Sequence, residues 1–137
     1  MATEMKIQLR QVSASTSEAT IGRHSVLIDR PTAKGGTDMG PMGGELFLAS
    51  AGGCFMSNLL AAVRARETNV SGVLIELTGS ISDDAPARFV KIDLHVSAES
   101  GDRESLEKLV EIADRGCIMM NTLRGTLALT IRHGVAA

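Results

Sequence analysis

The sequence predicts an α+β fold: one domain over residues 1–137, in which largely antiparallel sheets pack around a central apolar helix. Several short segments alternate apolar and polar residues, as half-buried strands do. Two longer segments repeat their apolar residues at helical spacing. The predicted strands and helices do not alternate strictly, which is typical of α+β rather than of parallel α/β folds. A chain of 137 residues is long enough to bury its own core.

The predicted strands lie in two groups, before and after the long apolar helix. Residues 5–12 and 24–29 are each predicted as a strand with one buried face, and the sequence SEATIGR between them as a further strand or hairpin. In the second group, residues 73–82 and 87–100 form two strands joined by a turn at DDAP. The last predicted strand has the sequence TLALTIRH.

A loop of unusual composition, residues 31–44, separates the first strands from the apolar helix. It contains two prolines and five glycines, which favour turns over regular structure. A loop of this length is uncommon in a small domain, so we expect it to be either mobile or functional. The loop lacks the G-x-x-x-x-G-K-[ST] order, and no G-x-G-x-x-G opens a helix, so little favours nucleotide binding.

Residues 45–66 are predicted to form the central helix. Its apolar positions recur at helical spacing: Phe47, Ala51, Phe55, Leu59, Ala62 and Val63. Small and polar residues interrupt the apolar run, which indicates a buried core helix and no membrane partner. Because the helix is apolar around most of its girth, one sheet face cannot cover it. We therefore expect an obligate homodimer with this helix at its centre.

The second predicted helix, residues 101–116, is amphipathic. Asp102 is its expected N-cap and Gly116 its expected C-cap. A short helix with the sequence CIMMNTLRG follows and leads to the last strand.

Composition and charge argue against several classes of function. The net charge is −2 and no block of Lys or Arg is interleaved with aromatics, so we expect no nucleic-acid partner. The sequence MATEMKIQLRQ does not resemble a signal peptide and the chain has two cysteines, so we expect a cytoplasmic protein with reduced thiols. His24, His95 and His133 lack metal-ligand spacing with the cysteines, so we assign no metal site and no cofactor.

Each of the two cysteines directly follows a glycine. Gly52 and Gly53 precede Cys54, although an interior glycine costs a helix about 0.5–1 kcal/mol. If this pair breaks the helix, a new helix begins near Gly53, and its free N–H groups and dipole favour the Cys54 thiolate. Cys117 follows Gly116 and opens the short helix in a similar way. Alternatively, both cysteines only fill the core and the glycines allow close helix packing.

Two segments of the sequence resemble the motifs of a known family. GPMGGELFLASAGGCF (residues 40–55) and ADRGCIMMNTL (residues 113–123) are similar to the two cysteine segments of the OsmC/Ohr family, the osmotically induced and organic-hydroperoxide-resistance proteins. The order of strands and helices and the separation of the cysteines also agree. The resemblance therefore covers nearly the whole chain, and it implies an OsmC-like intertwined homodimer with active sites at the subunit interface.

The resemblance also implies roles for five residues. Cys54 would attack the peroxide and become a sulfenic acid, and Cys117 would condense with it to an intramolecular disulfide. An arginine from the N-terminal strands would hold the thiolate, with Arg30 as the first candidate and Arg23 as the second. Glu45 would orient that arginine. A dithiol reductant, lipoyl-type or thioredoxin-like, would restore both thiols.

The sequence departs from the family pattern at both motifs. The family's Cys-Pro-Val-Ser segment reads CIMM here. The family's glutamate often stands ten positions before the cysteine, where this chain has Gly44, whereas Glu45 is nine positions before Cys54. On a continuous helix that separation is ~13 Å along the axis and half a turn around it. These differences indicate a divergent subgroup.

The resulting prediction is a thiol-dependent peroxidase that reduces organic hydroperoxides through Cys54 and Cys117. One alternative is a non-catalytic dimeric stress protein that binds an apolar small ligand in a methionine-rich groove between its subunits. A soft-metal site built on methionine and cysteine is a third hypothesis.

Overall fold

The computed structural model describes residues 2–136 of the chain. The chain divides into two compact units, one ending at Phe47 and the other beginning at Leu48. Each unit contains one three-stranded sheet, and the long helix α1 (Gly43–Ala65) begins in the first unit and continues in the second. The α+β class predicted from the sequence, with two small sheets and a central apolar helix, is confirmed.

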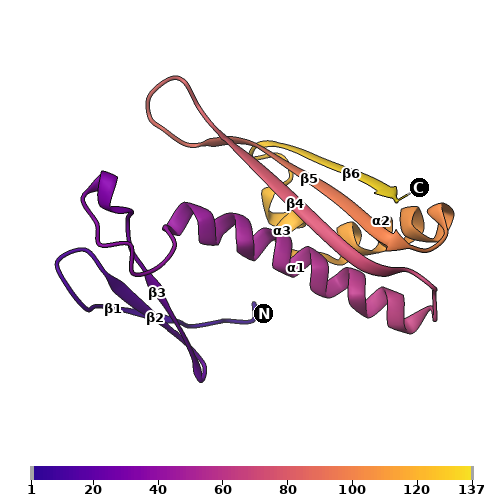
Figure 1. Ribbon diagram of the computed structural model, residues 1–137, viewed down its shortest axis with the longest axis horizontal. Helices are drawn as coiled ribbons and strands as arrows, with labels where there is room; N and C mark the ends of the chain where they lie inside the picture. Colours follow the sequence, from indigo (N-terminus) through magenta and orange to yellow (C-terminus); the bar gives the residue numbers. More distant parts are fainter. Residues whose placement is uncertain (1, 137) are drawn as a thin grey trace. The chain divides into compact units, whose positions relative to one another are not determined.

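The first unit consists of an antiparallel sheet and the loop that follows it. The strands β1 (Gln8–Gln11), β2 (Ser17–Ile21) and β3 (His24–Ile28) are neighbours in space in their chain order (Figure 1). All three predicted strands are confirmed, although β1 is shorter than the alternating segment 5–12. Every residue of β1 is exposed in the single chain.

The glycine- and proline-rich loop between β3 and α1 contains one turn of 3-10 helix, η1 (Thr32–Lys34). A Cβ atom at Gly36 would stand 1.9 Å from the carbonyl oxygen of Arg30. At Gly40 it would stand 2.1 Å from the carbonyl oxygen of Leu27. Only glycine fits so close to a backbone oxygen, so these two positions allow the loop to fold back against the end of β3.

The second unit contains the sheet β4-β5-β6. β4 (Ser71–Ile81) and β5 (Phe89–Ser100) form a long antiparallel pair, whereas β6 (Ala128–Val135) lies parallel to β5. A parallel neighbour requires a crossover connection, which the helices α2 (Arg103–Gly116) and α3 (Ile118–Leu123) provide. The pairing is therefore largely antiparallel, as predicted, with β6 as the exception.

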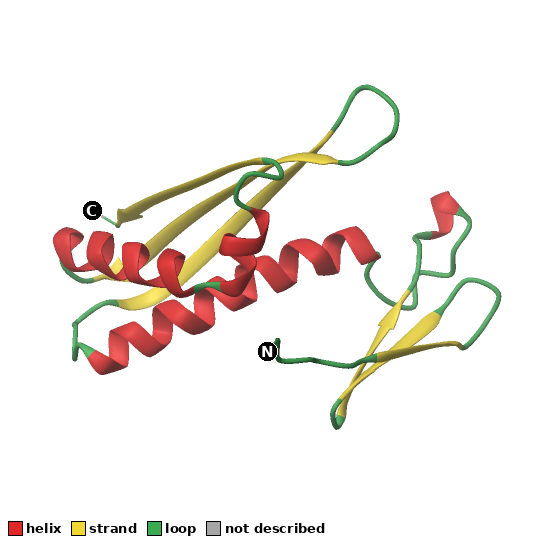
Figure 2. Cartoon of the chain, turned by 180° about the vertical axis from the view of Figure 1, so that it is seen from behind, coloured by secondary structure: helices red, strands yellow, loops and turns green. Residues whose placement is uncertain are grey.

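Apolar side chains from the sheet and from two helices form the core of the second unit. Figures 1 and 2 show that α1 and α2 lie on the same face of the sheet. Every second residue of β5 is buried toward this face, and each helix buries one stripe: Ile92, Leu94, Val96 and Ala98 from β5; Ala51, Phe55, Leu59 and Ala62 from α1; Leu106, Leu109, Val110 and Ala113 from α2. All four stripe residues of α1 are among the apolar positions predicted for that helix.

α1 is one continuous helix, so of the two possibilities for Gly52 and Gly53 the helix break does not occur. Gly52 is buried, and a Cβ atom there would stand 2.5 Å from Cδ1 of Leu77 on β4. Gly53 is exposed and has open space at its Cβ position. The first glycine therefore lets the helix approach the sheet, and the i to i−4 hydrogen bonds continue through both positions.

The ends of α2 agree with the prediction at one terminus and differ at the other. The side chain of Asp102 caps the N-terminus by accepting a hydrogen bond from the backbone N–H of Ser105. Gly116, the predicted C-cap, is instead the last helical residue, and Cys117 is the cap. The displacement arises because α3 begins directly after Cys117, which leaves no room for a longer turn.

α1 is long and apolar enough to cross a membrane, by length and composition alone, with a mean hydropathy of 1.7 over 18 residues. The same helix supplies Phe55 and Leu59 to the core of the second unit, as a core helix does. Only 28% of that apolar window is buried within the single chain. The remaining faces of α1 are therefore uncovered in one copy.

Candidate active site

The structure brings the two cysteines of the chain together. The Sγ atoms of Cys54 and Cys117 lie 3.3 Å apart, with the Cys117 thiol as donor. Both thiols are free. A disulfide bond is ~2.05 Å long, so the two sulfur atoms lie little more than 1 Å farther apart than they would in a disulfide.

Secondary structure positions each thiol. Cys54 projects from the middle of α1, one helical turn before Asn58. Cys117 occupies the single position between α2 and α3, and its backbone N–H donates to the carbonyl oxygen of Asp114. The pair therefore joins α1 to the junction of α2 and α3 within the second unit.

The two thiols differ in burial. Cys117 is fully buried and Cys54 is half-buried. Burial raises the pKa of the Cys117 thiol, and the adjacent Cys54 sulfur raises it further, while the backbone N–H groups of Met119 and Met120 act in the opposite direction. The thiol form of Cys117 is therefore favoured, and it donates its hydrogen toward the more accessible sulfur of Cys54.

The expected helix N-terminus at Cys54 is not present. Cys54 lies in the interior of α1, where its backbone N–H belongs to the regular hydrogen-bonding ladder. Free N–H groups at a helix start therefore cannot favour its thiolate. Cys117 does precede a short helix as predicted, but the effect of burial on its pKa is the larger one.

Asn58 lies beside both cysteine segments. Its Nδ2 atom donates a 2.9 Å hydrogen bond to the carbonyl oxygen of Cys54 and lies 4.0 Å from the Cys54 Sγ atom. Its Oδ1 atom faces Gly116, where a Cβ atom would stand 3.5 Å away. Sequence reasoning did not select this residue. The available signal was its spacing, because a residue four positions after a cysteine on a continuous helix lies on the same face.

The other three predicted site residues lie in the first unit. Arg23 is exposed in the turn between β2 and β3, and Arg30 follows β3. The carboxylate of Glu45 accepts a 2.9 Å hydrogen bond from the backbone N–H of Met42, at the start of α1. Among residues 2–136, neither arginine forms an ion pair with Glu45. The structure thus brings the two cysteines together but does not pair the arginines with the glutamate.

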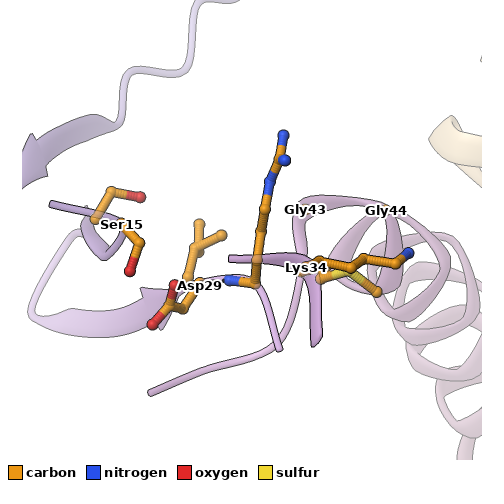
Figure 3. Close-up of a pocket in the computed structure, with 9 residues that line it drawn as sticks. Ser15, Asp29, Lys34, Gly43 and Gly44 are labelled. Atoms are coloured by element: carbon orange, nitrogen blue, oxygen red, sulfur yellow. Dashed lines mark hydrogen bonds between the residues drawn. The ribbon is translucent and has the colours of Figure 1, made fainter. Parts of the chain in front are cut away.

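A cavity of about 510 Å³ in the first unit contains Arg30 in its wall. Figure 3 shows Lys34 and the first turn of α1 at Gly43 and Gly44 on one side of it, and Ser15 and Asp29 on the other. The lining therefore combines charged and polar side chains with the apolar side chains of Ile28 and Met42.

Asp29 is a second residue that sequence reasoning missed. It is buried, and its carboxylate accepts hydrogen bonds from the hydroxyl groups of Thr16 and Thr37 and from the backbone N–H groups of Arg30, Thr37 and Met39. These donors hold the pKa of the Asp29 carboxyl well below its usual range, with the Thr37 hydroxyl as the largest cause. The carboxylate thereby ties both ends of the loop to β3.

No group of three or more His, Cys, Asp or Glu side chains within residues 2–136 has a geometry that could hold a metal ion.

Comparison with protein families gives a match to the family described as OsmC-like protein, over residues 35–132. The matched segment is most of the chain and includes both cysteines. The chain belongs to the OsmC-like family. A sequence comparison with curated proteins gives no match.

Several solved structures share the OsmC-like fold along nearly their whole length. A hypothetical protein from Aquifex aeolicus VF5 has a TM-score of 0.84 at 18% identity, with 98% of each chain covered. The OsmC like protein from Mycoplasma pneumoniae has a TM-score of 0.82 at 20% identity, with 99% of this chain and 98% of that chain covered. The organic hydroperoxide resistance protein OhrB of Bacillus subtilis has a TM-score of 0.72 at 22% identity, with 96% and 98% covered. At these identities the likeness shows the fold alone.

Proposed function

We propose that this OsmC-like protein is a thiol-dependent peroxidase that reduces organic hydroperoxides, with Cys54 as the attacking and Cys117 as the resolving cysteine. The observation that carries the proposal is the 3.3 Å separation of their sulfur atoms. Free cysteines in a protein core are usually inert packing residues. Two free thiols in direct contact, in a family with members named as organic hydroperoxide resistance proteins, support a redox pair instead.

The difference in burial supports the division of roles. The half-buried Cys54 can be reached by a substrate, whereas the fully buried Cys117 cannot be the sulfur that attacks the hydroperoxide first. Because the pKa of Cys117 is raised by burial, this cysteine keeps its proton until a partner sulfur takes part in the reaction. This arrangement favours attack by Cys54 and later condensation by Cys117.

The proposed cycle balances as a two-electron exchange. The Cys54 thiolate attacks the distal oxygen of the hydroperoxide, the O–O bond breaks, and the alcohol leaves with a proton. Cys54 is then a sulfenic acid. The Cys117 sulfur attacks the Cys54 sulfur, the S–O bond breaks, water leaves, and the disulfide forms. A dithiol of the lipoyl or thioredoxin-like class reduces this disulfide and is itself oxidised.

Arg30 stays our first candidate for the cation that holds the thiolate, and Arg23 the second. Arg30 lies in the wall of the cavity in the first unit, whereas Arg23 lies in an exposed turn. Glu45 is the candidate that would orient the arginine, and its carboxylate already accepts one bond from Met42.

The proposed active form is a cytoplasmic homodimer. Each of its chains is a single OsmC-like domain over residues 1–137. The support is the uncovered part of α1, which includes the 42%-exposed Leu60. Exposed apolar helix surface is unfavourable in water, and a second copy of α1 would bury it.

The proposal is tested by stopped-flow oxidation with an alkyl hydroperoxide, using wild type, Cys54→Ser and Cys117→Ser. Wild type should consume hydroperoxide much faster than free cysteine and form a Cys54–Cys117 disulfide. Cys54→Ser should lose all turnover, since the attacking sulfur is gone. Cys117→Ser should complete a single oxidation and accumulate a Cys54 sulfenic acid, which mass spectrometry detects after trapping.

The control is the wild-type protein alkylated at both thiols, which should be inert. If wild type consumes hydroperoxide no faster than free cysteine does, the peroxidase proposal is wrong. That result would favour the alternative of a non-catalytic protein that binds an apolar small ligand. If Cys117→Ser turns over as many times as wild type, the resolving role of Cys117 is wrong.

A further inference from the structure

The Asn58 carboxamide is held in a fixed position next to the sulfur of Cys54. A backbone carbonyl oxygen can only accept hydrogen bonds, so the amide group that faces the Cys54 carbonyl at 2.9 Å must be the NH₂ group. That bond folds the side chain back along α1 by one turn. The orientation of the amide is therefore set by the backbone of the helix and not by the sulfur.

An NH₂ group has two hydrogens, and the first is engaged by the carbonyl oxygen of Cys54. The same nitrogen lies 4.0 Å from the Cys54 Sγ atom, within reach of a long hydrogen bond to sulfur, and the second hydrogen is the one that can make it. Neutral thiols accept hydrogen bonds weakly, whereas a thiolate is a charged acceptor and gains more from the same donor. A donor in this position would therefore interact more strongly with a thiolate than with a neutral thiol.

α1 is continuous at Cys54, so the free N–H groups and dipole of a helix start are not available to this sulfur. The Cys117 thiol is the other hydrogen-bond donor near Cys54, at 3.3 Å. Two donors from different elements thus converge on one sulfur, one from α1 itself and one from the junction of α2 and α3.

We infer that Asn58 is a further functional residue, whose side-chain N–H stabilises the anionic form of the Cys54 sulfur and so sets the reactivity of that thiol. The inference rests on the proposed function in so far as Cys54 is the attacking sulfur. The Asn58 N–H would act on the Cys54 sulfur before any peroxide binds. The rate at which the thiolate reacts with any electrophile therefore reports on the effect of Asn58.

The test is the pH dependence of the rate at which iodoacetamide alkylates Cys54, measured in a Cys117→Ser background so that one thiol reacts. Asn58→Leu keeps the size of the side chain and removes the donor. At neutral pH it should react about tenfold more slowly, because the thiolate loses a charge-assisted hydrogen-bond donor. The rate should recover when the pH is raised enough to ionise the thiol without help.

Asn58→Asp gives a second, independent variant of nearly the same shape. It replaces the donor by an anion that repels the thiolate, so its rate at neutral pH should fall below that of Asn58→Leu. The matched control is Asn121→Leu. Asn121 also donates from Nδ2 to a backbone carbonyl oxygen, that of Arg115 at 3.2 Å, but in an exposed position. This control should alkylate at the wild-type rate at every pH.

Circular dichroism and thermal unfolding establish that each variant is folded before its rate is used. If folded Asn58→Leu and Asn58→Asp follow the same pH–rate curve as the background protein, the inference is overturned. That result would leave the peroxidase proposal standing, which hydroperoxide consumption by wild type decides. Conversely, a shifted alkylation curve in a protein that does not consume hydroperoxide would support the role of Asn58 and reject the proposed activity.

Discussion

Gly52 and Gly53 are neighbours in sequence but have different surroundings in the structure. The first faces Leu77 on β4 within the second unit, and the second faces open space. A buried glycine whose Cβ position is occupied by another side chain is a packing requirement, whereas an open one is not. The two positions can therefore be separated by experiment.

A double-mutant cycle between positions 52 and 77 tests this contact. Gly52→Ala forces the Leu77 side chain to move, and overpacking of this kind costs about 1–3 kcal/mol. In Gly52→Ala/Leu77→Ala the new methyl group occupies the vacated space. We expect the loss in free energy of unfolding to be smaller than the sum of the two single losses by about 0.5–3 kcal/mol.

The control for this cycle is Gly53→Ala combined with Leu77→Ala. The side chains at positions 53 and 77 do not contact each other, so their effects on the free energy of unfolding should add to within about 0.5 kcal/mol. Urea unfolding monitored by circular dichroism measures all the variants. Additive effects for positions 52 and 77 would contradict the close approach of α1 to β4.

Single residues of the candidate site were predictable to different extents. Cys54 and Cys117 could be selected as a pair from two glycine-preceded cysteines and from the family motifs. Their 3.3 Å contact could not, because they are 63 positions apart in the sequence and only the packing of α1 against the helix junction brings them together. The role of Asn58 depends on the helix being continuous, and from the sequence the two glycines left both a break and a continuous helix open.

At the scale of elements, the loop after β3 depends on one buried carboxylate. Asp29 accepts hydrogen bonds from the Thr16 hydroxyl, just before β2, and from the Met39 backbone N–H, in the loop. These donors lower the pKa of its carboxyl. A group with a lowered folded-state pKa contributes stability at pH values above its unfolded pKa, which is about 3.9 for aspartate. That contribution is lost as the pH falls from about 4 toward the folded-state value.

The corresponding prediction compares Asp29→Asn with wild type at pH 7 and at pH 3. An amide has one neutral acceptor oxygen, whereas the carboxylate has two oxygens that share a negative charge. The variant should therefore be less stable than wild type at pH 7. The difference should shrink at pH 3, where wild type has lost part of the contribution of its carboxylate. Thermal unfolding at the two pH values measures both effects.

Asp83→Asn is the matched control for acid stability. Asp83 is exposed in the turn between β4 and β5 and has no hydrogen bond or ion pair with any residue of the described range 2–136. Its variant should keep the wild-type dependence on pH. A constant difference between Asp29→Asn and wild type at both pH values would contradict a carboxylate that is ionised in the folded loop.

The helices and strands themselves were well predicted, because each is specified by a local pattern. Period-two alternation located β1 to β5, and the amphipathic pattern of residues 101–116 located α2. The direction of β6 was not predictable in the same way. Whether a strand pairs parallel or antiparallel depends on how the intervening helices return to the sheet, and no residue of β6 encodes that route.

For the whole molecule, the uncovered faces of α1 are the decisive feature. Leu60 is 42% exposed on a helix whose opposite stripe is buried. We expect the protein to have twice the 14.4 kDa mass of one chain in solution. Leu60→Lys should shift it toward the monomer, since a buried lysine without a partner is unfavourable at a helix interface.

Sedimentation equilibrium of wild type, Leu60→Lys and Leu74→Lys measures this shift. Leu74 is also exposed, at 55%, but it lies on β4 and points away from the helices, so its variant should stay dimeric. Monomeric wild type at micromolar concentration would reject the dimer. A dimeric Leu60→Lys would place the contact on another surface.

The position of the thiol pair has a mechanical consequence for the second unit. A bond between Cys54 and Cys117 would enclose β4, β5 and α2 in one covalent ring of 63 positions. Closing a ring of that length removes conformational freedom from the unfolded chain equivalent to about 4 kcal/mol. The protein would then be most resistant to unfolding just after it has reacted and least resistant while it waits for substrate, so each catalytic turn would tighten and relax the same fold.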